Sequence, residues 1–233
     1  MFILSGPYNS SFLGKSLRNI NEPVLALPGT KIPFGNSYKI NKKDDFEITL
    51  SNKKILTSLE DSLDYLNNNF KEHESVKIAN LFKNKFLFRD RLARTCVFPK
   101  FEYQKIDSPT TITVDYIKNN PKVLKPVSGI SSKNVTILNN IKKDFYVEAS
   151  QNNSYILEKY IHGIELAVDG YYDSSGFPVI INITQHEFFS DSDVSDTLYW
   201  TNLKLIQTHI RKIEYLLQDI KTKQVCDKNN VKC

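Results

Sequence analysis

The stretch KPVSGISSKNV, residues 125–135, decides the fold that we expect for this chain. Apolar residues stand before it at Val123 and Leu124 and after it up to Leu138, so the pattern predicts two strands joined by a loop of small residues. Such a loop lets the backbone approach an anion, and its successive N–H groups can surround phosphate oxygens. Lys125 adds a positive charge at the end of the first strand. A Ser-rich hairpin turn explains the same residues equally well, so this stretch alone leaves both interpretations open.

A second stretch, ILEKYIHGIELAVDG, covers residues 156–170. Its pattern predicts a strand that runs into a hinge over residues 158–163 and then a second strand over 164–169, where Glu165 and Asp169 share one face. A strand that ends in a hinge offers an adenine ring an apolar slot with backbone donors and acceptors, and a carboxylate a few residues later can bind ribose hydroxyls. Taken alone, a strand edge with a solvated acid remains the more common explanation.

The two stretches, together with NKFLFRDRL at residues 84–92, resemble in order and spacing the motifs of the ATP-grasp superfamily. The resemblance covers residues 81–190 and implies a mixed α/β (α+β) fold with an incomplete large lobe. It further implies three parts. Residues 1–80 would form a shortened N-terminal α/β domain, residues 81–157 the small lobe, and residues 158–233 the hinge and part of the large lobe.

The resemblance also implies an ATP site, although it identifies no catalytic residue. Lys85 and Lys125 would bind the phosphates, a flap over residues 128–132 would cover them, Glu158 would accept from the adenine amino group, and Glu165 would hold the ribose. The backbone near Tyr160 and Ile161 would meet the edge of the ring. The full expected set is Lys85, Lys125, Ser128, Gly129, Ser131, Ser132, Glu158, Lys159, Tyr160, Ile161 and Glu165. Family members commonly have glycine where this loop has Asn134, and asparagine is the next-best residue for a left-handed backbone.

Magnesium is the second ligand that the resemblance implies, and here the chain departs from the family pattern. Family members hold Mg²⁺ with acids on two late strands, including a Glu-x-Asn pattern, because the ion requires hard oxygen ligands beside the phosphates. After the long C-terminal helix this sequence offers only KTKQVCDKNNVKC, residues 221–233. Glu187 and Asp191 are weak substitutes, and a solvated acidic loop is the favoured explanation for them. We therefore expect a C-terminally truncated family member, either a fragment or a natural short form.

The function implied is that of an ATP-dependent ligase that joins an unidentified carboxylate to an amine through an acyl phosphate, or of the N-terminal part of one. The alternative is a non-catalytic nucleotide-binding module without a metal site. A second copy of the chain could cover the sheet edge that the missing strands leave exposed, so a homodimer is a further hypothesis.

Composition excludes several other classes of partner. The chain has 31 Lys and Arg against 26 Asp and Glu, but the basic residues are dispersed, so we expect no nucleic-acid partner. No apolar run is long enough to span a membrane and the N-terminus does not resemble a secretion signal, which favours a cytoplasmic protein. Three cysteines without a paired pattern give no support for zinc.

Hydrophobic periodicity predicts the remaining elements. Helices are expected over residues 10–20, 59–70, 84–94, 111–119, 141–150 and 199–220, with a break marked by residues 67–69 and 71–75 and a polar tail after the last helix. Further strands are expected over residues 2–4, 24–27, 46–50 and 179–187.

Overall fold

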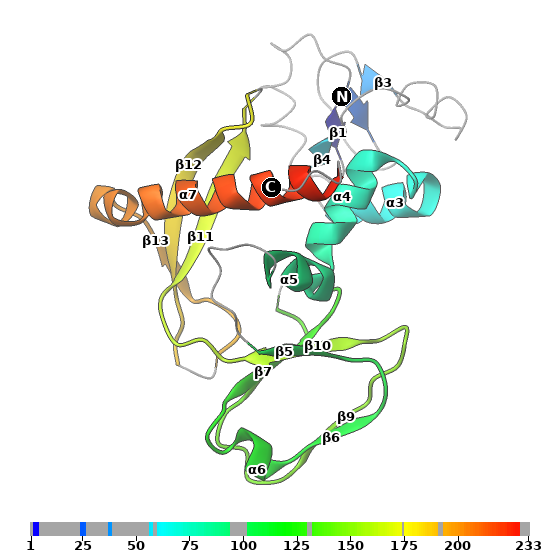
Figure 1. The fold of residues 1–233 in the computed structure, drawn as a ribbon, viewed down its shortest axis with the longest axis vertical. Coiled ribbons are helices and arrows are strands. Elements are labelled where there is room, and N and C mark those ends of the chain that lie inside the picture. The colour runs from blue at the N-terminus through cyan, green and yellow to red at the C-terminus, as the bar shows by residue number, and fades with distance from the viewer. Residues whose placement is uncertain are drawn as a thin grey trace. The chain divides into compact units, whose positions relative to one another are not determined.

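A computed structural model describes residues 2–4, 24–26, 37–38, 56–57, 60–93, 102–129, 132–173, 175–190 and 193–228 (Figure 1). The fold is mixed α/β, as predicted. The chain divides into two compact units, Met1–Phe82 and Lys83–Cys233. Within the described ranges no helix has the length and apolar character needed to cross a membrane.

The first unit contains a parallel four-stranded sheet in the order β3-β2-β1-β4. Its strands are β1 (Phe2–Leu4), β2 (Val24–Ala26), β3 (Ser37–Tyr38) and β4 (Leu56–Thr57). The parallel pairing of β1 with β2 agrees with the expected β-α-β beginning, because parallel neighbours require a crossover connection. The helix expected over residues 10–20 and the strand expected over 46–50 lie outside the described residues.

Two helices follow in this unit, α3 (Glu60–Phe70) and α4 (Glu74–Lys83). α3 confirms the predicted apolar face, since Leu63, Leu66 and Phe70 are all buried. The expected break is shorter than predicted, because residues 67–69 belong to α3. A tight turn, in which the His73 N–H donates to the Phe70 carbonyl over 2.9 Å, takes only residues 71–73. The chain then resumes a helix at Glu74, whose acid suits a helix N-terminus.

The second unit begins with α5 (Lys85–Ala93), a helix that the sequence predicted, and continues into an antiparallel sheet in the order β5-β10-β7-β8. The strands of this sheet are β5 (Tyr103–Ile106), β7 (Lys122–Pro126), β8 (Thr136–Leu138) and β10 (Tyr155–Lys159). Strands β7 and β8 are the two that were expected on either side of residues 125–135. The central pair, β7 and β10, runs antiparallel with Leu124 opposite Leu157.

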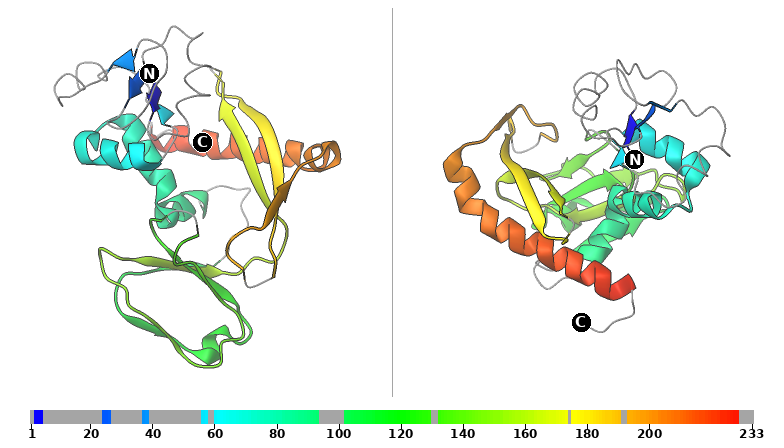
Figure 2. Two further views of the ribbon diagram at one scale, coloured as in Figure 1. Left: turned by 180° about the vertical axis from the view of Figure 1, so that it is seen from behind. Right: turned by 90° about the horizontal axis from the view of Figure 1, so that it is seen from above.

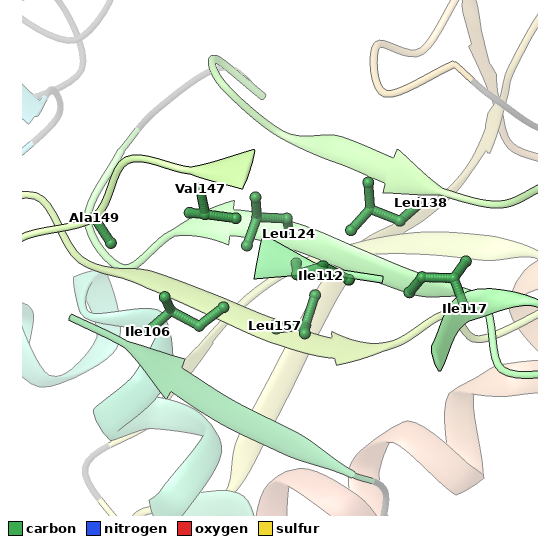
Figure 3. Packing of buried hydrophobic residues seen from close by; sticks show 8 residues of the cluster. All are labelled: Ile106, Ile112, Ile117, Leu124, Leu138, Val147, Ala149 and Leu157. Atoms are coloured by element: carbon green, nitrogen blue, oxygen red, sulfur yellow. The ribbon is translucent and has the colours of Figure 1, made fainter. Parts of the chain in front are cut away.

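The hydrophobic core of this region lies on one face of that sheet (Figure 3). It gathers side chains from the sheet, from helix α6 (Val114–Ile117), from the antiparallel pair β6 (Thr110–Ile112) and β9 (Phe145–Val147), and from the segment after β9. The buried members are Ile106, Ile112, Ile117, Leu124, Leu138, Val147, Ala149 and Leu157. Because side chains alternate along a strand, Val123 and Lys125 on β7 and Glu158 on β10 belong to the opposite face.

One predicted helix in this region was wrong, and a second was predicted too long. The segment expected to be helical over residues 141–150 contains strand β9, which pairs with β6 and buries Val147 while Tyr146 is exposed. The helix expected over 111–119 is shortened to α6, because Thr111 pairs with β9 and Thr113 caps the helix, its hydroxyl accepting from the Tyr116 N–H.

A third sheet, in the order β11-β12-β13, packs against the long helix α7 (Leu203–Lys228). Its strands are β11 (Glu165–Tyr172), β12 (Pro178–Glu187) and β13 (Leu198–Trp200). All views show α7 running beside the yellow β11–β12 hairpin (Figures 1 and 2). The hairpin confirms the predicted strands, whereas β13 was not predicted. The long helix expected over residues 199–220 begins later, at Leu203, and continues further, to Lys228.

The hairpin contains a β-bulge that determines which side chains share a face. Asp169 pairs with Asn182 but Gly170 pairs with Ile180, so Ile181 is the extra residue and is 69% exposed. Gly170 permits this close approach, because a Cβ there would lie 2.6 Å from the backbone oxygen of Val179. The register leaves two different faces: Ile183, fully buried, belongs to the face covered by α7, and Glu165 and Asp169 share the opposite face, as predicted.

Candidate functional site

The first residue of helix α5 is hydrogen-bonded to the segment that follows strand β7. The Asn84 side chain accepts from the Leu87 N–H over 2.9 Å and so caps the helix. The Lys85 N–H donates to the Val127 carbonyl over 2.9 Å, and its Nζ donates to the Gly129 carbonyl over 3.0 Å. The expected phosphate ligand Lys85 is therefore in contact with the expected flap.

The carboxylate of Glu158 lies between two cations. Arg89, one helical turn after Lys85 on α5, donates to Oε2 through Nε at 3.0 Å and Nη2 at 2.8 Å, and Lys125 Nζ lies 2.5 Å from Oε1. The Glu158 side chain is only 5% exposed, against 24% for Arg89 and 29% for Lys125. A carboxylate that is so buried requires such partners, because an unpaired buried charge is costly. We call these three residues the triad.

The triad joins segments that are distant in sequence, and it pairs two residues that were predicted to contact the nucleotide separately. Lys125 and Glu158 were both expected at a nucleotide site, and the structure brings them into direct contact. Both carboxylate oxygens of Glu158 are engaged by cations, so its contact with an adenine amino group stays a prediction. Arg89 had been part of a motif without a role of its own. The one available signal was its spacing of four residues from Lys85.

The flap retains the backbone features expected of it in its described part. Ser128 and Gly129 are exposed at the end of β7, and Ser131 lies outside the described residues. Ser132 and Asn134 have φ angles of 53° and 58°, and the Val135 N–H donates to the Ser132 carbonyl over 3.2 Å. The expectation that asparagine takes a left-handed conformation at position 134 is confirmed.

The hinge after β10 has a specific pattern of occupied backbone groups. The Lys159 N–H donates to the Glu102 carbonyl and the Tyr160 N–H donates to the Pro121 carbonyl, both over 2.9 Å. These two donors are therefore unavailable to the edge of an adenine ring. For Tyr160, the predicted backbone contact with the ring would have to come from the carbonyl. Among the backbone hydrogen bonds of the described residues, none occupies the N–H of Ile161, whose side chain is 62% exposed.

Glu165, the expected ribose ligand, begins strand β11 and is more exposed than Glu158. It stands directly opposite His186, whose Nδ1 is 3.5 Å from Glu165 Oε1 and 3.2 Å from Asp196 Oδ2. The His186 ring also packs at 5.3 Å, in a tilted geometry, against Tyr199. Among the described residues, no ion pair or hydrogen bond joins Glu165 to the triad. Sequence reasoning missed His186 because only the hairpin register places it beside Glu165.

The residues nominated for magnesium do not fit a metal centre in the part of the chain that the structure describes. Glu187 Oε1 accepts from Gln185 Nε2 and Trp200 Nε1, each over 2.9 Å, so hydrogen bonds already satisfy this oxygen. Asp191 lies outside the described residues. No group of three or more His, Cys, Asp or Glu side chains suited to a metal occurs among those described.

Comparison with known proteins identifies the fold. The family model described as "ATP-grasp domain" matches residues 118–230, and no curated protein sequence matches. Among solved structures, L-amino acid ligase from Bacillus licheniformis matches with a TM-score of 0.57 and 10% identity, over 94% of this chain and 59% of the other. N5-carboxyaminoimidazole synthetase from Staphylococcus aureus, complexed with ADP, gives 0.56 and 12%, over 94% and 62%. Phosphoribosylglycinamide synthetase from Anaerococcus prevotii gives 0.54 and 11%, over 95% and 61%.

The chain spans about three-fifths of the length of these structures. At such low identity the likeness shows the fold, and the family model shows the domain. Residues 118–230 of this chain therefore carry an ATP-grasp domain.

Proposed function

We propose that this chain binds ATP and acts as an ATP-dependent carboxylate–amine ligase, or as the N-terminal part of one. The observation that carries the proposal is the triad, in which Lys125 and Arg89 enclose the buried Glu158 carboxylate at the base of the flap. Two cations against one carboxylate leave this end of the sheet suited to an anionic ligand.

The nucleotide would lie between flap and hinge. Lys85 and Lys125 would contact its phosphates, the Ile161 N–H would donate to the adenine edge, and Glu165 would accept from the ribose hydroxyls. Lys85 supports this assignment by its contact with the Gly129 carbonyl, because it places an ammonium group directly at the flap. An ATP-grasp domain implies ATP as the ligand.

The chemistry would proceed in two balanced steps. A substrate carboxylate oxygen attacks the γ-phosphorus of ATP, the bond to the β-phosphate oxygen breaks, and ADP leaves with an acyl phosphate formed. An amine then attacks the acyl carbon, the proton goes to solvent or a base, and inorganic phosphate leaves. The site residues would contribute positioning and charge neutralisation, which dominate phosphoryl transfer. The names of the matched structures, one ligase and two synthetases, support bond formation as the reaction class.

The proposal is tested by ATP calorimetry followed by a coupled ADP-release assay. The assay uses mixtures of carboxylates and amines, with amino acids first. Binding of ATP together with ADP release that depends on both substrates supports the ligase. Absence of ATP binding rejects the proposal altogether.

A second function, ATP binding without turnover, is favoured by one observation. Glu187, a candidate magnesium ligand, already accepts hydrogen bonds from Gln185 and Trp200 through its Oε1. If ATP binds with the same affinity in the presence and absence of Mg²⁺ and no substrate pair releases ADP, this second function replaces the first.

A further inference from the structure

Lys122, at the start of β7, is a charged residue buried outside the triad. Its side chain is 1% exposed, and lysine is seldom so buried unless it is paired. Its Nζ lies 2.6 Å from Glu102 Oε2 and 5.2 Å from the centre of the Tyr116 ring. Because Lys122 is three residues before Lys125 on the same strand, it belongs to the opposite face of the sheet and takes no part in the triad.

Glu102 connects this lysine to two further side chains. The Tyr116 hydroxyl donates to Oε1 over 2.9 Å, and Asn120 Nδ2 lies 3.4 Å from Oε2. The hydrogen bond from Lys122, followed by those from Tyr116 and Asn120, lowers the pKa of Glu102 to about 2. Glu102 is therefore held as a carboxylate that accepts from three donors. We call Glu102, Tyr116, Asn120 and Lys122 the clamp.

The clamp lies where the hinge backbone is attached to the sheet. The Glu102 carbonyl accepts from the Lys159 N–H, and the carbonyl of Pro121, which lies between two clamp residues, accepts from the Tyr160 N–H. Both hydrogen bonds that hold the first hinge residues thus end on clamp residues or on their direct neighbour. Glu102 stands just before the edge strand β5, where backbone segments open more easily, so its side-chain contacts can add to the order of its carbonyl.

We propose that the clamp positions the hinge backbone so that the N–H of Ile161 and the adjoining carbonyls are preformed for an adenine base, with Glu102 as the positioning residue. The inference rests on the proposed function and adds a determinant of base specificity to it. Preformed backbone donors and acceptors favour binding because no ordering is required when the ligand arrives.

The first test uses the protein without ligand. Hydrogen exchange is measured for Glu102→Ala and for Tyr116→Phe. The second variant is milder, because it removes a single donor and preserves the ring, and it keeps the test available if Glu102→Ala fails to fold. The Lys159 and Tyr160 amides should exchange roughly tenfold faster in Glu102→Ala and less so in Tyr116→Phe, while other β10 amides stay unchanged. Asp107→Ala is the matched control, because it removes a lysine–carboxylate pair at the other end of β5.

The second test compares ATP with inorganic tripolyphosphate, which shares the phosphates but lacks the base. In Glu102→Ala the affinity for ATP should fall roughly fivefold while that for tripolyphosphate is unchanged, and Glu102→Gln should restore part of the loss because an amide oxygen still accepts from Tyr116. Equal losses for both ligands would indicate a merely structural role and overturn the inference.

The two proposals fail in different ways. The unmodified chain binds ATP in the first case, but Glu102→Ala changes neither the amide hydrogen exchange of the hinge nor the ratio of the affinities for ATP and tripolyphosphate. That result overturns the role of the clamp and leaves the proposed function intact. No ATP binding by the unmodified chain overturns the proposed function, and the inference about adenine falls with it.

Discussion

Replacing Glu158 by glutamine is the most informative perturbation of the candidate site. The change keeps the size of the side chain but removes the charge that Arg89 and Lys125 share. If the carboxylate compensates both cations, the variant should lose stability and at the same time bind an anion more tightly. A residue that only contacted adenine would show neither effect.

The structure sets the size of the stability loss. Removing one partner of a fully buried ion pair costs about 3–5 kcal/mol. The cations here retain 24% and 29% side-chain exposure, and solvent can therefore replace part of the lost interaction. We expect Glu158→Gln to lower the free energy of unfolding by about 2 kcal/mol. At a typical urea dependence this lowers the unfolding midpoint by about 1 M.

The chain has a single tryptophan, Trp200, which lies in the second unit, so its fluorescence reports the unfolding of the unit that carries the site. Calorimetry then measures tripolyphosphate affinity, which should rise roughly tenfold when the neutralising charge is removed. Asp107→Asn, which makes the same chemical change in an exposed pair of the same unit, should alter neither quantity. An unchanged urea midpoint, or weaker tripolyphosphate binding in Glu158→Gln, would refute the charge balance that we assign to the triad.

Three further outcomes are expected. Lys125→Ala should weaken ATP binding by about 1.5–3 kcal/mol, measured by calorimetry, whereas Lys105→Ala in the same sheet should not; equal affinities would reject the phosphate role. Gly170→Ala should lower the urea midpoint by the equivalent of roughly 1–3 kcal/mol, because its Cβ would lie 2.6 Å from the Val179 backbone oxygen; an unchanged midpoint would show that the bulge adjusts. The pKa of Glu102 falls from 4.5 to about 2 on folding, so its contribution to stability is complete above pH 4.5 and is lost as the pH falls towards 2. The stability difference between the unmodified chain and Glu102→Gln should therefore shrink over that range in urea titrations, and a constant difference would contradict the assigned pairing.

Periodicity predicted the elements in which the apolar pattern extends over several turns of a helix or along a whole strand. Helix α3 and the long helix α7 were identified because their apolar residues recur over several turns. Strand β11 was identified because apolar residues alternate over 164–169, and β12 because a turn precedes it and it returns as the second strand of a hairpin. Strand β9 was mistaken for helix since three residues give too little pattern, and its conformation depends on pairing with β6, more than 30 positions earlier.

The candidate site divides in the same way. Lys85, Lys125 and Glu158 could be nominated because each stands in a motif of neighbouring residues. The contact of Arg89 with Glu158 spans 69 positions, and no local pattern encodes it. His186 meets Glu165 only through the register of the hairpin, which also depends on a bulge that alternation does not reveal.

Strand β7 carries one lysine beside the proposed phosphate site and another beside the hinge proposed to bind adenine. Alternation directs Leu124 and Lys122 to the core face of the sheet and Lys125 to the face that meets α5. The apolar layer that buries Leu124 also removes Lys122 from water, so this lysine must have a carboxylate partner, and Glu102 at the neighbouring sheet edge supplies it. On the other face Lys125 is partly exposed and shares Glu158 with a second cation, so it is placed to contact a ligand. Burial thus separates the two lysines, since the buried Lys122 is enclosed with its carboxylate partner and the partly exposed Lys125 can reach an anion.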